Sequence, residues 1–372
     1  MQPDKKRNAK KLVVFAVKSA TAALLLYLLL RKAQYGVFAQ NFRGIAWGWV
    51  IAAASLHIPG YIVSAHRWRI LLKAQGLSPS LWKLVRSYVT ATFFNYVLLG
   101  TLGGDVSRVY DTGAKTRKGA EAFSAVLLER VTGVAAMMFL AVVGIIVLLI
   151  GPERPSVSPF WSVGVALVIC LVISAILFAA LLVLFHPRIA ETLAAILDRP
   201  GPLLGKVRKT LLSLHCTIAV YRANRVPVYK NLFWAAALQV NVTLHYFFLG
   251  LAMGLPLLRH PLYYFWSYMV IVPAVTLILT IPLTPGGAGV REWTLRELRG
   301  GLGFPGTLSG TAGALLLGWL QVGTVLFFGG IGFVMFLHRI FCARRSKSQT
   351  LKTQNASDVL SENPDSRVET TP

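Results

Sequence analysis

A short motif occurs twice in the chain, each time beside strongly apolar sequence. Two glycines are followed by three residues and an arginine, in Gly103-Gly104-Asp105-Val106-Ser107-Arg108 and again in Gly286-Gly287-Ala288-Gly289-Val290-Arg291. Glycine allows a tight turn, and the N-terminus of a following helix carries about half a positive charge. With its arginine, each motif predicts a cradle for a phosphate or carboxylate. The alternative is close helix packing with arginines that reach lipid headgroups, but the recurrence in both halves favours a site.

A charged pair lies inside the apolar run 122–150. Glu129 and Arg130 are adjacent there, and a charge at the centre of a membrane helix costs about 2.5–3.5 kcal/mol on insertion scales. Such residues usually face the bundle interior and pair with other charges. We predict that Glu129 holds Arg108 or Arg291 and leaves Arg130 for a ligand. An interfacial pair near the cytoplasmic helix end is the competing interpretation.

Helices are predicted after both Gly-Gly pairs. Asp105 is expected to cap the first of them, and residues 288–298 are strongly helix-compatible. In the second, Arg296, Glu297 and Arg299 belong in part to a solvated face with supportive charge pairs. The predicted substrate-binding residues are therefore Gly103, Gly104, Asp105, Arg108, Glu129, Arg130, Gly286, Gly287, Arg291 and Glu292.

Four polar residues are weaker candidates for lining a cavity. Asn95 and Tyr96 precede the first turn, and Asn241 and His245 lie four apart on one helix face. Buried polar groups in lipid need partners, so plain interhelical hydrogen bonds are the alternative for all four.

Signals for catalysis or for a bound cofactor are poor. The sequence offers no serine-histidine-aspartate arrangement and no phosphate-binding loop, and Asp105 with Asp111 are too few carboxylates for a diphosphate-binding magnesium site. The three cysteines are far apart and the histidines form no spaced cluster. We therefore predict a protein that is not an enzyme and that carries no metal and no cofactor.

Composition places the chain in a membrane. Hydrophobic residues make up 55% of the 372 residues and charged residues only 14%, whereas soluble domains carry about 25% charged residues. The net charge of +24 comes from basic residues that flank apolar segments. This distribution indicates membrane topology and attraction to anionic lipid, and it argues against nucleic-acid binding.

Eight apolar stretches and two polar segments organise the chain. The basic N-terminus leads into an uncleaved membrane helix at about 12–30 rather than a signal peptide. Residues 186–230 are basic and include an amphipathic turn set, and residues 341–372 are predicted to be a disordered cytoplasmic tail. The seven later apolar stretches are 44–65, 84–102, 121–150, 160–185, 231–254, 263–284 and 307–338.

The distribution of lysine and arginine indicates which stretches cross. If all eight crossed, the two sides would hold equal numbers of basic residues, whereas re-entrant segments at 84–102 and 263–284 place most of them on the cytoplasmic side. A single re-entrant segment fits slightly less well. We predict an all-α polytopic membrane protein, residues 1–340, with about six spanning helices, two re-entrant segments and both termini cytoplasmic. Its halves, 12–150 and 160–338, would form an inverted repeat, a transporter architecture.

Two stretches resemble a known family. Residues 95–108 with 124–130, and then Pro282-Leu283-Thr284-Pro285-Gly286-Gly287-Ala288-Gly289-Val290-Arg291-Glu292, are similar to the signatures of the lysylphosphatidylglycerol synthase transmembrane family, the flippase-like domain family. The resemblance covers residues 10–340 and implies an inner-membrane protein that moves lipids or lipid-linked molecules. The full-length synthases add an aminoacyl-transfer domain, which is expected to be absent here. The chain departs from the family in lacking a proline near the first Gly-Gly.

Together these features predict a lipid translocator. The phosphate of an anionic phospholipid or polyprenyl-linked lipid would be held by Arg108, Arg130 and Arg291 near the bilayer midplane. Glu129 and Glu292 would position or neutralise these arginines. A membrane-embedded enzyme acting on a lipid-linked substrate, or an accessory subunit that recruits an enzyme, remains the alternative.

Overall fold

The structure, a computed structural model, describes residues 40–97, 102–113, 118–151, 217–280, 284–304 and 310–362, with isolated positions at 24–28 and 164–192. Within these residues every regular element is helical. In the described part of the chain, five helical segments are long and apolar enough to cross a membrane, at 47–74, 119–150, 226–252, 261–278 and 311–338. The protein is therefore an all-α polytopic membrane protein. Most of the predicted stretches 12–30 and 160–185, and most of 186–216, lie outside the described residues.

Five helices form the described part of the N-terminal half. They are α3 (Trp47–Ser55), α4 (His57–Ala74), α5 (Leu81–Val97), α6 (Leu102–Gly113) and α7 (Gly119–Ile150). The bend between α3 and α4 lies at Leu56, and Pro59 follows in the first turn of α4, where its missing N–H costs least. The predicted apolar stretch 84–102 is thus divided, because α5 ends at Val97 and α6 begins at Leu102.

The C-terminal half has a matching order of long and broken helices. It contains α11 (Val226–Ala252), η1 (Leu257–Arg259), α12 (Pro261–Ile278), η2 (Pro285–Gly287), α13 (Val290–Gly301) and α14 (Thr311–Glu362). Pro261 opens α12 at a position where proline is favoured. As in the N-terminal half, a long helix is followed by a break and a 12-residue helix.

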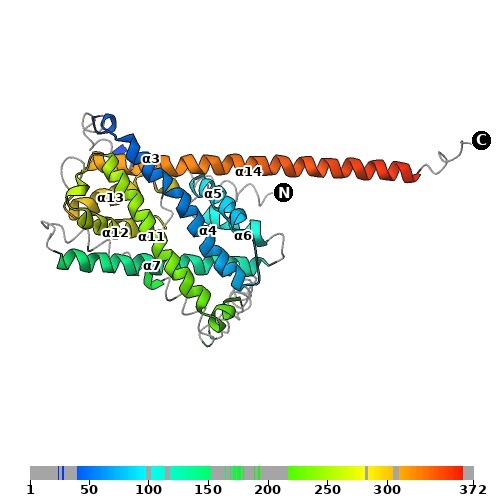
Figure 1. Cartoon of the computed structure of the whole chain (residues 1–372), viewed down its shortest axis with the longest axis horizontal. Coiled ribbons are helices and arrows are strands. Elements are labelled where there is room, and N and C mark those ends of the chain that lie inside the picture. Colours follow the sequence, from blue (N-terminus) through cyan, green and yellow to red (C-terminus); the bar gives the residue numbers. More distant parts are fainter. Residues whose placement is uncertain are drawn as a thin grey trace, which may run out of the picture.

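Helix α14 differs from the sequence prediction at its C-terminal end. The sequence predicts disorder from residue 341, whereas the helix continues to Glu362 and its last turns extend beyond the other helices (Figure 1). No glycine or proline occurs between Gly332 and Pro364. The polar segment therefore contains no helix breaker, and the helix ends just before the proline.

Helix pairs from the two halves pack against each other in a reciprocal pattern. α5 packs on α14 and α12 packs on α7, while α4 contacts α11. α7 and α14 form opposite edges of the helical body in Figure 1. The short helices pack within their own halves instead, α6 against α7 and α13 against α14.

Glycines allow the two reciprocal crossings to be close. A β-carbon on Gly332 of α14 would overlap the carbonyl of Val89 on α5. A β-carbon on Gly144 of α7 would lie 3.1 Å from Val270 Cγ2 and 3.3 Å from Trp266 O on α12. Small residues at helix crossings let backbones approach, which is how membrane helices gain packing energy.

Two apolar clusters hold the bundle together. The larger one joins α11, α12, α13 and α14 around fully buried side chains such as Leu249, Tyr268, Ile271, Leu295 and Leu317. The smaller one joins α4, α5, α7 and the helical residues 217–223. This smaller cluster supports the side chains that surround the first Gly-Gly motif.

Candidate functional site

Asp105 is shared by two arginines in the first turn of α6. Arg108 Nη2 lies 2.6 Å from Asp105 Oδ1, and Arg130 Nη2 lies 2.8 Å from Asp105 Oδ2. Burial alone would raise the pKa of Asp105, but the charges of Arg130 and Arg108 and their hydrogen bonds outweigh it and lower the pKa below its usual value. The carboxylate therefore stays ionised between two cations.

Arg108 is buried and is neutralised on a second side by Glu129. Its Nη1 donates to Glu129 Oε2 at 3.0 Å, and the hydroxyl of Tyr88 donates to Glu129 Oε1. The guanidinium carbon lies 4.2 Å from the Tyr88 ring centroid and 4.9 Å from that of Trp68. Two carboxylates and two aromatic faces thus enclose the cation. The predicted pairing of Glu129 with Arg108 is confirmed.

Arg130 is the accessible member of this cluster. Its side chain is 45% exposed, whereas that of Arg108 is 3% exposed. The structure therefore places Arg130 where a ligand can reach it, although the arginine is also bound to Asp105. The sequence did not predict that Asp105 connects the two arginines.

A polar network behind Glu129 ties three helices together. Arg67 Nη2 donates to the carbonyl of Glu129 at 3.1 Å and to Asn231 Oδ1 at 3.2 Å, and Asn231 Nδ2 donates to Arg67 O at 2.9 Å. Thr132 also donates to Asn231 Oδ1, at 2.6 Å. These bonds fix α4, α7 and α11 around Glu129. Arg67 is one of several basic residues between positions 66 and 86. In the sequence these residues indicate only which side of the membrane the segment lies on.

The first Gly-Gly pair does not form a turn before the helix. Gly103 and Gly104 are helical, and α6 begins at Leu102, so the prediction that Asp105 caps the helix is wrong. A β-carbon on Gly104 would lie 2.5 Å from Asn95 Oδ1 and 2.7 Å from Ala91 O on α5. Gly104 N donates to Asn95 Oδ1 at 2.9 Å. This glycine thus allows α6 to pack closely on α5, and Asn95 caps its backbone.

The second Gly-Gly pair does form a turn. Gly286, Gly287 and Gly289 have φ values of 60°, 73° and 81°, a left-handed region that favours glycine. α13 then begins at Val290, and Glu292 Oε2 accepts a bond of 2.7 Å from Gly289 N. The same sequence spacing therefore produces two different backbone conformations.

Arg291 and Glu292 are both buried and both face α14. Arg291 Nη1 donates to Gln321 Oε1 at 3.0 Å, and Nη2 donates to the carbonyl of Gly286. Glu292 approaches Gly318, whose β-carbon would lie 2.6 Å from Oε1. Both acceptors of Arg291 are uncharged, which differs from the environment of Arg108.

The second Gly-Gly motif contacts the helix that leads to the first, but among the described residues the two arginines have different partners. η2 contacts α5, the helix that precedes the first motif. Arg108 is held by Asp105 and Glu129, whereas Arg291 is held by Gln321 and Gly286.

Arg299 is a buried cation, although its charged neighbours predicted that this part of the helix belongs in part to a solvated face. That prediction is wrong for Arg299, which is 0% exposed. None of its three side-chain nitrogens has a hydrogen-bond partner among the described residues. The guanidinium lies 5.2 Å from the Phe304 ring centroid. Arg296 and Glu297 do form a charge pair, at 3.6 Å, with both side chains one-third exposed.

Two of the weaker candidates, on α11, lie next to residues of α3 and α4. His245 Nδ1 lies 2.8 Å from Ala53 O, and its ring is 4.7 Å from that of His57. Asn241 is partly buried, and its Oδ1 would lie 3.3 Å from a β-carbon on Gly60 of α4. The side chain of Tyr96 lies outside the described residues. No group of three His, Cys, Asp or Glu side chains in the described part of the chain could hold a metal ion.

Comparison with known families accounts for most of the chain. A family model described as the lysylphosphatidylglycerol synthase TM region matches residues 13–329. The chain belongs to this family. Neither the curated proteins nor the solved structures yield a match. The family supports a lipid-related membrane function and confirms the resemblance found in the sequence.

The family match includes both arginine clusters and the buried Arg299. It ends at residue 329, within α14, so the last part of the 311–338 span and the helix beyond it lie outside the matched region. Residues 330–362 therefore lie outside the part of the chain that matches the family.

Proposed function

We propose that this member of the lysylphosphatidylglycerol synthase TM family moves an anionic phospholipid, or another phosphate-bearing lipid, between the leaflets. The observation that carries the proposal is the sharing of Asp105 between a buried and an exposed arginine. A lipid phosphate that approaches Arg130 replaces Asp105 as its partner. Arg108 stays neutralised meanwhile, because it keeps both Asp105 and Glu129.

The second cluster supports the same role from the other half of the chain. Arg291 is buried, and the acceptors that it contacts among the described residues are neutral. A buried cation held by neutral acceptors attracts an anion strongly, and a phosphate would give it a charged partner. In this proposal Glu292, on the same turn of α13, limits how tightly the phosphate is held, so that the lipid can leave again.

An inverted repeat gives the movement a structural basis. α5 packs on α14 and α12 packs on α7, with a glycine at each crossing. This reciprocal packing supports two repeats, each of which packs its last long helix against the other repeat. In such folds one repeat rocks against the other around a fixed site, and broken helices supply that site. The proposal includes re-entrant segments ending near the two Gly-Gly motifs, an inner-membrane location and cytoplasmic termini.

Reconstitution into vesicles tests the function directly. Phosphatidylcholine proteoliposomes that contain fluorescent phosphatidylglycerol are compared with protein-free vesicles and with vesicles that contain fluorescent phosphatidylcholine. We expect faster exchange of the anionic lipid between leaflets when the protein is present, and a smaller effect on the zwitterionic one. Equal rates with and without protein would contradict transport and would favour a role as a membrane-embedded enzyme or accessory subunit.

A further inference from the structure

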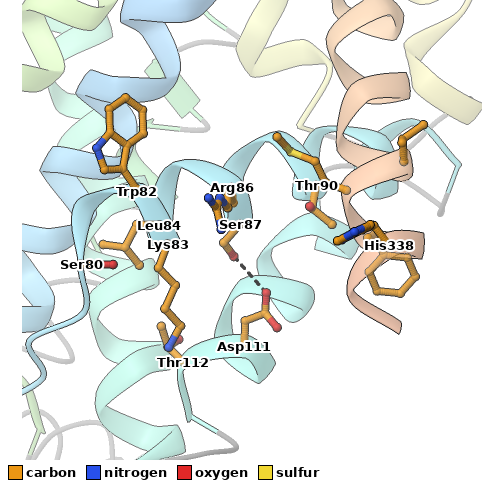
Figure 2. Close-up of a pocket in the computed structure, with 13 residues that line it drawn as sticks. Ser80, Trp82, Lys83, Leu84, Arg86, Ser87, Thr90, Asp111, Thr112 and His338 are labelled. Atoms are coloured by element: carbon orange, nitrogen blue, oxygen red, sulfur yellow. Dashed lines mark hydrogen bonds between the residues drawn. The ribbon is translucent and has the colours of Figure 1, made fainter. Parts of the chain in front are cut away.

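A pocket of 860 Å³ lies between the start of α5, the end of α6 and the far part of the 311–338 span of α14 (Figure 2). The pocket is separate from the Arg108 cluster but adjoins it, since Thr112 in its wall donates to Arg108 O at 2.7 Å. Its α14 wall begins at Val334. That wall lies beyond the family match, which ends at residue 329.

The composition of the rim places the pocket at the membrane surface. The 311–338 span ends at His338, which lines the pocket. Trp82 is 65% exposed in the opposite wall, and tryptophan is enriched at the boundary between lipid and water. Lys83 and Arg86 follow Trp82 in α5 by one and four residues. A pocket with these residues lies at the depth of lipid headgroups.

The polar part of the pocket suits a phosphate. Lys83 and Arg86 are exposed cations, while the one carboxylate of the wall, Asp111, accepts a bond of 3.4 Å from Ser87 (Figure 2). The two cations Lys83 and Arg86 outnumber the one aspartate among the lining residues, which leaves an excess of positive charge.

The apolar part of the pocket suits an acyl chain. Val334 and Met335 on α14 are 65% and 41% exposed. Further exposed apolar side chains, Phe327 and Ile331, precede them on the same helix. These side chains belong to the 311–338 span, so an acyl chain can continue along them from the pocket into the bilayer.

We propose that this pocket holds an anionic phospholipid before it reaches the arginine clusters, with its phosphate between Lys83 and Arg86 and an acyl chain along α14. The inference rests on the proposed function in treating the lipid as cargo. It adds the place where the lipid is first captured and the residues that select its charge.

Lipid binding measured apart from transport tests the inference. The protein is placed in phosphatidylcholine nanodiscs with a small fraction of phosphatidylglycerol, and the bound lipid is counted by native mass spectrometry. The variant Lys83→Gln/Arg86→Gln removes both cations of the pocket. The matched control, Arg225→Gln/Lys230→Gln, removes two exposed cations at the start of α11.

We expect the pocket variant to bind phosphatidylglycerol about 30-fold more weakly, since each basic residue near a membrane surface contributes about fivefold. The control should bind it as the wild type does. Equal losses in both variants, or no loss in either, would overturn the inference. Displacement of the lipid by soluble glycerol phosphate at comparable concentration would assign the pocket to a free anion and overturn it as well.

The result of the lipid-binding experiment can be distinguished from the result of the transport assay. Normal translocation with unchanged lipid binding in Lys83→Gln/Arg86→Gln would contradict the proposed capture site and leave the proposed transport function intact. Selective lipid binding at the pocket without any translocation would support the binding site and contradict the proposed transport function.

Discussion

The ion pair between Glu129 and Arg108 should contribute strongly to stability, and its loss gives a measurable result. Glu129→Gln keeps the size of the side chain and removes its charge. The pair is separated by 3.0 Å, and the side chains are 3% and 8% exposed. With Arg130 and Asp105 included, the cluster is electrically neutral. The variant leaves one net positive charge among these four side chains, next to Arg108, which is 3% exposed.

The expected cost is about 3 kcal/mol. Breaking a buried pair by neutralising one partner typically costs about 3–5 kcal/mol. The lower end applies because Arg108 keeps Asp105 at 2.6 Å and because the new amide still accepts a bond from Tyr88. Unfolding in mixed detergent micelles measures the change. Glu297→Gln is the matched control, since its pair with Arg296 is one-third exposed at 3.6 Å and should be worth less than about 1 kcal/mol.

A double-mutant cycle isolates the pair itself. In Glu129→Gln/Arg108→Met the remaining pair, Arg130 with Asp105, is balanced again. The double variant should therefore lose about 1–3 kcal/mol less than the sum of the two single variants. An additive double variant, or a Glu129→Gln protein as stable as Glu297→Gln, would refute the reasoning.

Three further changes have expected outcomes that thermal unfolding, followed by tryptophan fluorescence, can check. Gly332→Ala should lose about 1–3 kcal/mol because the methyl group meets the carbonyl of Val89, whereas Gly330→Ala, which has open space, should not; equal shifts would argue against the α5–α14 crossing. Gly287→Ala should be similarly destabilising because of its φ of 73° and the nearby Leu279. Arg299→Met should raise stability by about 1–3 kcal/mol, since it removes a buried cation that has no hydrogen-bond partner among the described residues; a lower stability would mean that the guanidinium is satisfied in the folded protein.

The sequence predicted the chemistry of the first cluster better than its geometry. The pairing of Glu129 with Arg108 followed from the cost of a charge in an apolar run, which holds whatever the fold. The shared role of Asp105 did not follow, because it depends on how α6 turns against α7. Trp68 and Tyr88 were missed for the same reason, since only tertiary packing brings their rings to Arg108.

Local sequence was least informative at the glycines and at Arg299. Gly-Gly is compatible with both a helix and a left-handed turn, and the packing of α6 on α5 selects the helix in the first copy. Arg299 lies among charged neighbours that favour an exposed face. It is buried because its turn of α13 packs towards Phe304 and α12. The helical segment after residue 341 was missed because a polar composition was taken as disorder.

Arg130→Gln tests the central claim most directly, because Arg130 is the exposed arginine and its removal should leave the fold intact. Its pair with Asp105 is partly solvated, so the expected loss of stability is below about 1 kcal/mol. The leaflet exchange of fluorescent phosphatidylglycerol in proteoliposomes is measured for this variant, for wild type and for Lys230→Gln as the control. We predict that exchange falls to the protein-free rate in Arg130→Gln and is unchanged in Lys230→Gln. Wild-type exchange in a correctly folded Arg130→Gln protein would contradict the account.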